Sequence, residues 1–130
     1  MTSIDVSTHT DTVAAALPTL HVRDITEEVA RAIAEADVTG GIAFLTGGPG
    51  TIIRVQEREN GFFCDVEELL ARFVPAGTAD RTRHLSFLLG PGTEQVPFLD
   101  RKLCLGTWQR VMLFDLEGQG RADWTLRLVG

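Results

Sequence analysis

The stretch that most constrains the fold lies near the C-terminus, between Leu103 and Gly118. Gly106 marks a turn inside it, and the residues after that turn, Thr107–Glu117, are mainly apolar and predict one long strand. A second segment, Ala122–Val129, alternates polar and apolar residues as a half-buried strand does. Because only a short glycine-containing segment separates the two, the sequence predicts a final β-hairpin.

Further strands are indicated upstream. Residues 19–23 alternate polar and apolar side chains, and residues 41–46 and 51–57 are rich in β-branched and apolar types. Gly47–Gly50 lies between the latter two and contains Pro followed by Gly, which is typical of a type II turn, so a hairpin is predicted there too. A strand over residues 12–17 and another over 95–99 each adjoin or contain a proline, which predicts edge strands.

Three segments favour helices. Asp24 or Thr26 could cap the first, in which Val29 and Ile33 recur at helical spacing. Asp65, with Glu68 three residues later, predicts the start of a second helix, and residues 84–89 predict a short helix or turn. The sum is an α+β fold: a mostly antiparallel β-sandwich with two or three short helices on one side. Residues 1–10 are polar and predict a flexible segment, and residues 11–130 predict a single domain.

Charge and composition exclude several partners. The 130 residues carry a formal net charge of -6, so the chain repels phosphate backbones and we expect no nucleic-acid partner. No apolar run is long enough for a bilayer and no signal-peptide pattern opens the chain, so we expect no membrane association and a cytoplasmic location. Cys64 and Cys104 lack metal-ligand spacing and predict free thiols in the core, a disulfide being the alternative. No metal or cofactor is expected.

An ordered set of short motifs resembles one family. The most specific is Leu105-Gly106-Thr107-Trp108-Gln109, followed by an apolar strand and a last strand that ends in Gly130. The other landmarks, in chain order, are Asp24-Ile25-Thr26, Asp65, Val74-Pro75, Leu88-Leu89-Gly90 and Val96-Pro97. Together they resemble the YjbQ-like family, whose members are often called secondary thiamine-phosphate synthase-like proteins. The resemblance implies a β-sandwich, a homotrimer, and a site of histidines and acidic groups at the subunit junction.

The sequence departs from the family pattern at the positions that carry this site. The glutamate of the first hairpin is retained as Glu57, but the neighbouring asparagine is Gln56 and the family's histidine position falls on Gly48. A second histidine position falls on Arg83, with His84 one place late. Losing an imidazole to glycine removes a ligand and a general base, so the resemblance implies a diverged site.

We therefore expect these positions to carry any function. Glu57 and His84 are the candidate catalytic acid–base residues, with Asp65 as an alternative partner for His84. Candidates for substrate binding are Arg54, Arg83, Gly48, Gln109 and Asp65. Each also has a structural interpretation: a solvated strand end for Glu57, an exposed side chain for His84, a helix cap for Asp65, a plain hairpin turn for Gly48, a contact across an interface for Gln109, and surface ion pairs for the arginines.

Two main functions remain open from the sequence. The first is a protein that binds or acts on a small organic, anionic ligand in a pocket near the predicted first hairpin. The alternative is a non-catalytic homotrimeric scaffold or ligand-binding module. The resemblance also implies a third function, thiamine-phosphate synthesis. The sequence leaves open whether the chain is an enzyme.

Overall fold

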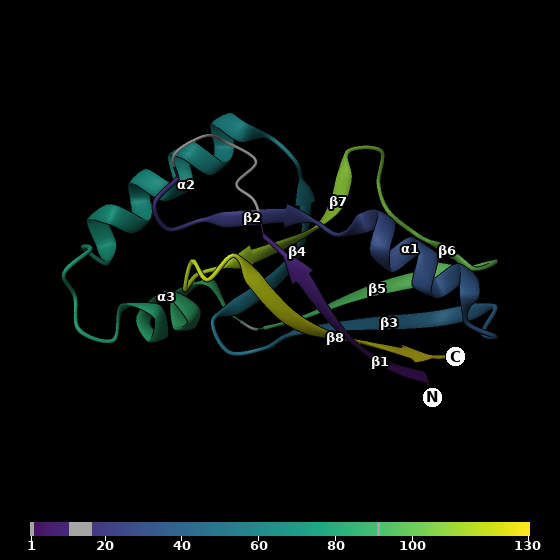
Figure 1. Cartoon of the computed structure of the whole chain (residues 1–130). Helices are drawn as coiled ribbons and strands as arrows, with labels where there is room; N and C mark the ends of the chain where they lie inside the picture. The colour runs from purple at the N-terminus through teal and green to yellow at the C-terminus, as the bar shows by residue number, and fades with distance from the viewer. Residues whose placement is uncertain (1, 11–16, 91) are drawn as a thin grey trace.

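The computed structural model describes residues 2–10, 17–90 and 92–130 and places them in two antiparallel sheets and three helices (Figure 1). No helix in these ranges is long and apolar enough to cross a membrane. The elements in chain order are β1 (Thr2–His9), β2 (His21–Asp24), α1 (Thr26–Glu35), β3 (Gly40–Gly47), β4 (Thr51–Glu57), α2 (Asn60–Phe73), α3 (Arg81–Leu89), β5 (Thr93–Leu99), β6 (Lys102–Leu103), β7 (Gln109–Asp115) and β8 (Arg121–Val129).

The sheets form a sandwich, as the sequence predicts. The larger sheet has the order β1-β8-β3-β5-β6, the smaller has the order β2-β7-β4, and all pairs are antiparallel. The α+β class, the mostly antiparallel strands and the three short helices are confirmed. The helices do not share one side, however: α2 and α3 pack on the smaller sheet, whereas α1 lies at the other end of the molecule (Figure 1).

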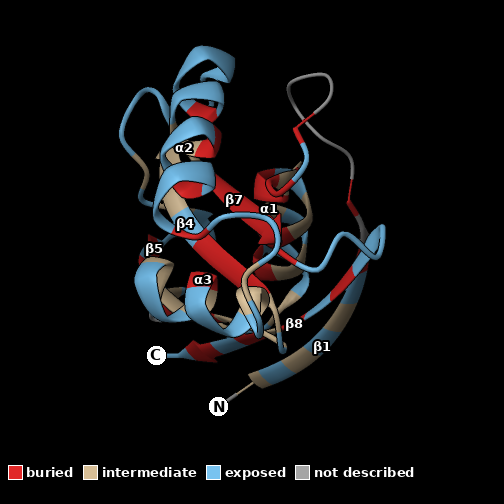
Figure 2. Cartoon of the chain, turned by 90° about the vertical axis from the view of Figure 1, so that its left-hand side faces the viewer, coloured by how far each residue is buried: buried red, intermediate tan, exposed pale blue. Residues whose placement is uncertain are grey.

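Strand β7 explains the apolar run near the C-terminus. Its side chains alternate between two cores: Val111 and Leu113 lie in the core between the sheets, whereas Met112 and Phe114 lie in the core under α2 and α3. Figure 2 shows the buried ribbon of β7 and β4 at the centre of the fold. A strand that is covered on both faces needs a continuous apolar sequence rather than an alternating one.

The two predicted hairpins are wrong in their pairing. β3 and β4 lie in different sheets, and so do β7 and β8; instead β4 pairs with β7, and β8 pairs with β1 and β3. The turn after β3 is of the predicted type, because Thr51 N donates to Gly48 O at 3.0 Å and Gly50 has a φ of 71°. The same tight turn can therefore connect two strands of one sheet or two strands of different sheets. The local sequence does not distinguish these two cases.

The N-terminal residues form a strand instead of the flexible segment suggested by their polarity. Thr2–His9 pair with β8, from Thr2 opposite Leu128 to His9 opposite Arg121. Ile4 and Val6 pack against the core between the sheets. Their alternation with polar residues is typical of a half-buried strand, and the overall polarity of the segment does not reveal it. The strand predicted over residues 12–17 lies almost entirely outside the described residues.

The first helix, α1, is confirmed and begins at Thr26, although its N-cap residue is Ile25 rather than Asp24 or Thr26, and the predicted start of α2 is corrected. In α1, Val29 and Ile33 are buried, as their spacing predicts. In contrast, α2 starts at Asn60, so Asp65 is not its N-cap but an exposed residue inside the helix. The cap is Glu59, whose carboxylate accepts hydrogen bonds from Gly61 N at 2.8 Å and Phe62 N at 2.6 Å.

The two cysteines differ from their predicted environment. Cys64 and Cys104 are free, but both are exposed rather than packed in the core. Cys64 lies on the solvent side of α2, and Cys104 follows the short strand β6. Their burial was predicted from residue type alone. In α2, the helical periodicity directs other side chains toward the core and leaves Cys64 on the solvent side.

Candidate functional site

An apolar cavity of about 190 Å³ lies between α2 and the smaller sheet. It opens in the core layer that α2 and α3 close over β4 and β7. The size is comparable with an engineered cavity of about 150 Å³ that binds benzene, so a molecule of about that size would fit. The lining residues are Leu20, Ile52, Arg54, Gln56, Phe62, Phe63, Val66, Leu89 and Phe114.

Only two of these lining residues are polar, and both come from β4. Arg54 and Gln56 follow Ile52 at strand spacing, so the three share the face of β4 that looks toward the helices. Among the described residues, the buried amide nitrogen of Gln56 has no hydrogen-bond partner. A buried donor left unpaired costs about 1–3 kcal/mol, so the wall of the cavity contains an unsatisfied polar group.

Arg54 lies at the open side of the cavity. Its side chain is exposed, and its Nη2 donates to the backbone oxygen of Leu89 at the end of α3. This contact joins β4 to α3 beside the cavity and uses one of the five guanidinium donors. The predicted binding residue Arg54 is therefore placed where its remaining donors can meet a ligand.

A second, shallower hollow adjoins the cavity. Its lining consists of Gln56, Glu57, Glu59 and Phe62, and it therefore shares Gln56 and Phe62 with the cavity. The candidate acid–base residue Glu57 lies here, exposed, at the end of β4. Two carboxylates thus stand beside the cavity entrance, and Glu59 is fixed there by its hydrogen bonds to the start of α2.

A buried carboxylate holds α2 over the cavity. Glu67 is 7% exposed, and its Oε1 accepts hydrogen bonds from Thr19 N and Leu20 N, both at 2.8 Å. These bonds tie the middle of α2 to the segment that leads into β2. Because Leu20 lines the cavity, Glu67 fixes one wall relative to the helix that forms the other.

Gly48, Arg83 and His84, three other predicted site residues, lie on the turn before β4 and on α3. Gly48 donates its N–H to Asp123 O at 2.8 Å and lines a hollow beside α3. On α3, Arg83 and His84 are both exposed, and His84 Nδ1 lies 2.9 Å from the backbone oxygen of Asp80. Arg83 lines a separate hollow together with Glu117.

The structure of one copy does not unite the predicted acid–base pair. The turn at Gly48 precedes the seven-residue strand β4 and Glu57 ends it, and a strand of that length spans about 20 Å. α3, which carries His84, borders the Gly48 end. Within the described residues, no group of three or more His, Cys, Asp or Glu side chains is placed to hold a metal ion.

Two further predicted residues have local contacts. Gln109 Oε1 accepts a hydrogen bond from Gly106 N at 2.7 Å, which closes the turn before β7, while the Asp65 side chain points to solvent from α2. The neighbouring Trp108, in the same motif, is 73% exposed in a single copy of the chain.

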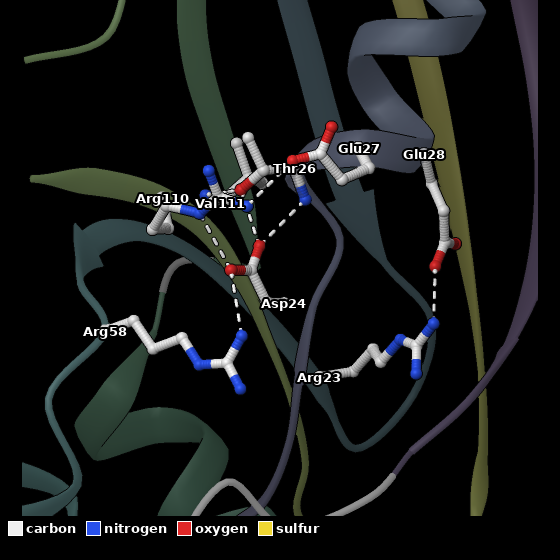
Figure 3. A network of polar contacts seen from close by, with 8 residues as sticks. All are labelled: Arg23, Asp24, Thr26, Glu27, Glu28, Arg58, Arg110 and Val111. Carbon is white, nitrogen blue, oxygen red and sulfur yellow. Dashed lines mark hydrogen bonds and ion pairs between the residues drawn. The ribbon is translucent and has the colours of Figure 1, made fainter.

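A cluster of polar side chains at the start of α1 is structural rather than cavity-lining. Asp24 accepts hydrogen bonds from Thr26 N at 3.0 Å, Thr26 Oγ1 at 2.6 Å and Arg110 Nε at 2.8 Å, and Arg58 Nη1 lies 3.5 Å away (Figure 3). Thr26 Oγ1 in turn accepts from Val111 N at 2.8 Å. These bonds attach the start of α1 to the central strand β7.

The charge of Asp24 is stabilised in this cluster. Burial raises the pKa of the Asp24 carboxyl, but the hydrogen bonds from Thr26 and Arg110 outweigh it and leave the pKa below its usual value. The side chain of Asp24 is only 7% exposed. Sequence reasoning found Asp24 as a helix-cap candidate; its partner Arg110, distant in sequence, could not be found that way.

Sequence reasoning also missed Gln56 and the apolar cavity wall. Gln56 was noted only as a replacement for asparagine, although its spacing from Ile52 and Arg54 places all three on one strand face. That alternation is the available signal. The wall formed by α2 depends on the helix start at Asn60, which the sequence assigned five residues too late.

Comparison with known proteins gives a family match and several similar folds. Residues 14–130 match the family model described as UPF0047 protein YjbQ-like. A UPF0047 protein of Archaeoglobus fulgidus is 29% identical over 107 residues, covering 76% of this chain and 83% of that protein. A UPF0047 protein of Methanothermobacter thermautotrophicus is 27% identical over 104 residues and covers 73% of each chain.

Solved structures show the same fold at lower identity. A YbjQ-like protein of unknown function from Sulfolobus solfataricus has a TM-score of 0.81 and 21% identity, with 99% of this chain and 96% of that chain covered. An uncharacterized conserved protein from Clostridium acetobutylicum has a TM-score of 0.81 and 21% identity, with 97% and 99% covered. At this identity the likeness establishes the architecture, and the site must be argued from this chain's own residues.

Proposed function

Because this chain belongs to the YjbQ-like UPF0047 family and carries an apolar cavity with two polar groups, we propose that it binds a small organic molecule there. The observation that carries the proposal is the buried, unpaired amide nitrogen of Gln56 in an otherwise apolar cavity. Such a combination of apolar walls and few directed polar groups is typical of ligand sites. The cavity lies beside β4, the second strand of the predicted first hairpin.

We propose binding in preference to acid–base catalysis within one copy. Glu57 lines the hollow beside the cavity, whereas α3, which carries His84, borders the hollow at the Gly48 end of β4. A general base must come within hydrogen-bond distance of the proton it removes, and none of the hollows described above is lined by both Glu57 and His84. A catalytic function would need one of them from a neighbouring copy.

Titration of ¹⁵N-labelled protein with benzene, 1-hexanol and benzoate tests the proposal. We expect chemical-shift changes that saturate at millimolar concentrations and are confined to the cavity walls. Val66→Trp places a large side chain in the cavity and should abolish them, whereas the matched control Ala71→Trp, on the exposed side of α2, should not. The absence of any saturable change with all three probes would refute the proposal.

The scaffold alternative is favoured by a separate observation. Five large apolar side chains are at least half exposed on α2 and α3, namely Phe62, Leu69, Phe73, Phe87 and Leu88. With about 200 Å² for a fully exposed aromatic side chain, they offer on the order of 600 Å². A standard interface buries about 800 Å² per partner, and single chains rarely expose apolar patches above about 600 Å².

We propose that a second copy of the chain covers these side chains in the homotrimer that the sequence resemblance implies. Acidic residues on α2, Asp65 and Glu68, and the basic Arg83 on α3 would complement each other if α2 of one copy met α3 of the next. Head-to-tail contacts of this kind form a closed ring when the rotation between successive copies completes a full turn, which for a trimer is one third of a turn per copy.

The molar mass in solution tests this assembly. Light scattering after size-exclusion chromatography should give about three times the 14.2 kDa of one chain. Phe87→Glu introduces a charge at the most exposed aromatic residue, which is 87% exposed, and should give a folded monomer. Ala34→Glu on the exposed side of α1 should leave the mass unchanged, and a wild-type monomer would contradict the proposal.

A further inference from the structure

We infer that the molecule held in this cavity is a monocarboxylic acid with a short hydrocarbon or aromatic body, and that Gln56 and Arg54 bind its carboxylate. The inference rests on the proposed binding function and adds the chemical class of the ligand. Three features of the cavity support it: the hydrogen-bond donors among its lining residues, the charged residues of the adjoining hollow, and its size.

The donors favour a group that only accepts hydrogen bonds. The amide nitrogen of Gln56 is buried without a partner in the described structure, and the Arg54 guanidinium donates to Leu89 O through one nitrogen only. The two residues are two apart on one strand face, so their side chains start about 7 Å apart and can converge on one group. An ionised carboxylate offers two oxygens and no donor, which matches an amide and a guanidinium together.

The charged residues beside the cavity favour a ligand with one negative charge over a ligand with two. Arg54 is the cation that lines the cavity, while Glu57 and Glu59 line the adjoining hollow. Glu59 is held in place by Gly61 N and Phe62 N and cannot turn away without uncapping α2. Among the residues that line the cavity and the adjoining hollow, a phosphate dianion would meet two carboxylates and one guanidinium, so a monoanion is repelled less by these residues.

The size and walls of the cavity limit the body of the acid. About 190 Å³ accommodates roughly one aromatic ring or a short aliphatic chain. Phe63 and Phe114 meet edge to face, with ring centroids 5.7 Å apart, and both form part of the wall. Aromatic rings and alkyl chains pack well against such apolar walls. A polyhydroxylated body would lose its hydrogen bonds to water without gaining hydrogen-bond partners in the cavity.

Three ligands that share a ring and differ in the head group test the inference: benzoate, benzyl alcohol and phenyl phosphate. In ¹⁵N-detected titrations at neutral pH we expect benzoate to bind at least tenfold more tightly than either of the others. The side-chain amide resonances of Gln56 should shift with benzoate and much less with benzyl alcohol. That measurement uses the wild-type protein and does not depend on a variant that must fold.

Substitutions distinguish the contribution of the head-group contact to binding from that of the apolar cavity. Gln56→Leu keeps the side-chain volume and should weaken benzoate binding at least tenfold while leaving benzyl alcohol unchanged; Gln95→Leu, at an exposed glutamine on β5, should change neither. Benzyl alcohol or phenyl phosphate binding as tightly as benzoate would overturn the inference and leave the binding function intact. No binding of any of the three would contradict the binding function itself.

Discussion

Replacing Leu113 by alanine is expected to lower the free energy of unfolding by about 3–4 kcal/mol. Leu113 is 0% exposed and lies on β7, the middle strand of the smaller sheet, where its side chain fills the core between the two sheets. The truncation loses the transfer free energy of the removed carbons and leaves a cavity that neighbouring strands cannot close. Chemical denaturation followed by circular dichroism measures the change.

Leu99→Ala serves as the matched control for this prediction. Leu99 is also a leucine on a strand, but it is 63% exposed, so the same truncation should change the free energy of unfolding by less than about 0.5 kcal/mol. If Leu113→Ala lowered the free energy of unfolding as little as Leu99→Ala does, the placement of β7 between two buried cores would be wrong.

The second large effect is expected for Asp24→Ala, at about 2–3 kcal/mol. The substitution removes the acceptor for Thr26 N and Thr26 Oγ1 and leaves Arg110 without its closest partner. The start of α1 would then lose its attachment to β7. The fully exposed Asp37, which pairs with Arg101 at 3.2 Å, provides the control: Asp37→Ala should have no measurable effect.

The pH dependence gives an independent test of the Asp24 cluster. Because the pKa of Asp24 is lower in the folded state than its usual value of 3.8, folding favours the charged form. The resulting stabilisation is fully present well above pH 3.8 and is lost as the pH falls below this value through the folded pKa. The difference in unfolding free energy between wild type and Asp24→Asn should therefore be constant near neutral pH and shrink below about pH 4. A difference that grew on acidification would mean a raised pKa and would contradict the hydrogen-bond geometry.

Part of the candidate site could be predicted from the sequence. Arg54 and Glu57 were singled out, and the structure places both beside one cavity and its adjoining hollow. Gly48 and Arg83 were singled out on the same grounds but lie beside other hollows. The positions of motifs along the sequence do not give the distances between side chains in the fold. Residues at both ends of a seven-residue strand were therefore assigned to one site.

The pairing of strands shows the same limit. The residues of Gly47–Thr51 determine a tight turn with Gly50 at positive φ, and that prediction is confirmed. Whether the following strand returns beside β3 or crosses to the other sheet depends on which faces are buried. β4 pairs with β7 because both strands have apolar residues for two cores at once.

The sequence by itself determined the family, the sandwich class, the position of α1 and the apolar character of β7. These follow from local patterns and from motifs that remain in order along the chain. Only the tertiary structure decided which strands are neighbours, where α2 begins relative to the sheet, and that Gln56 lines a cavity with its amide nitrogen buried and unpaired in the described structure. The physical reason is that a pocket is made by side chains distant in sequence, whose meeting is set by the burial of two cores and not by any one segment.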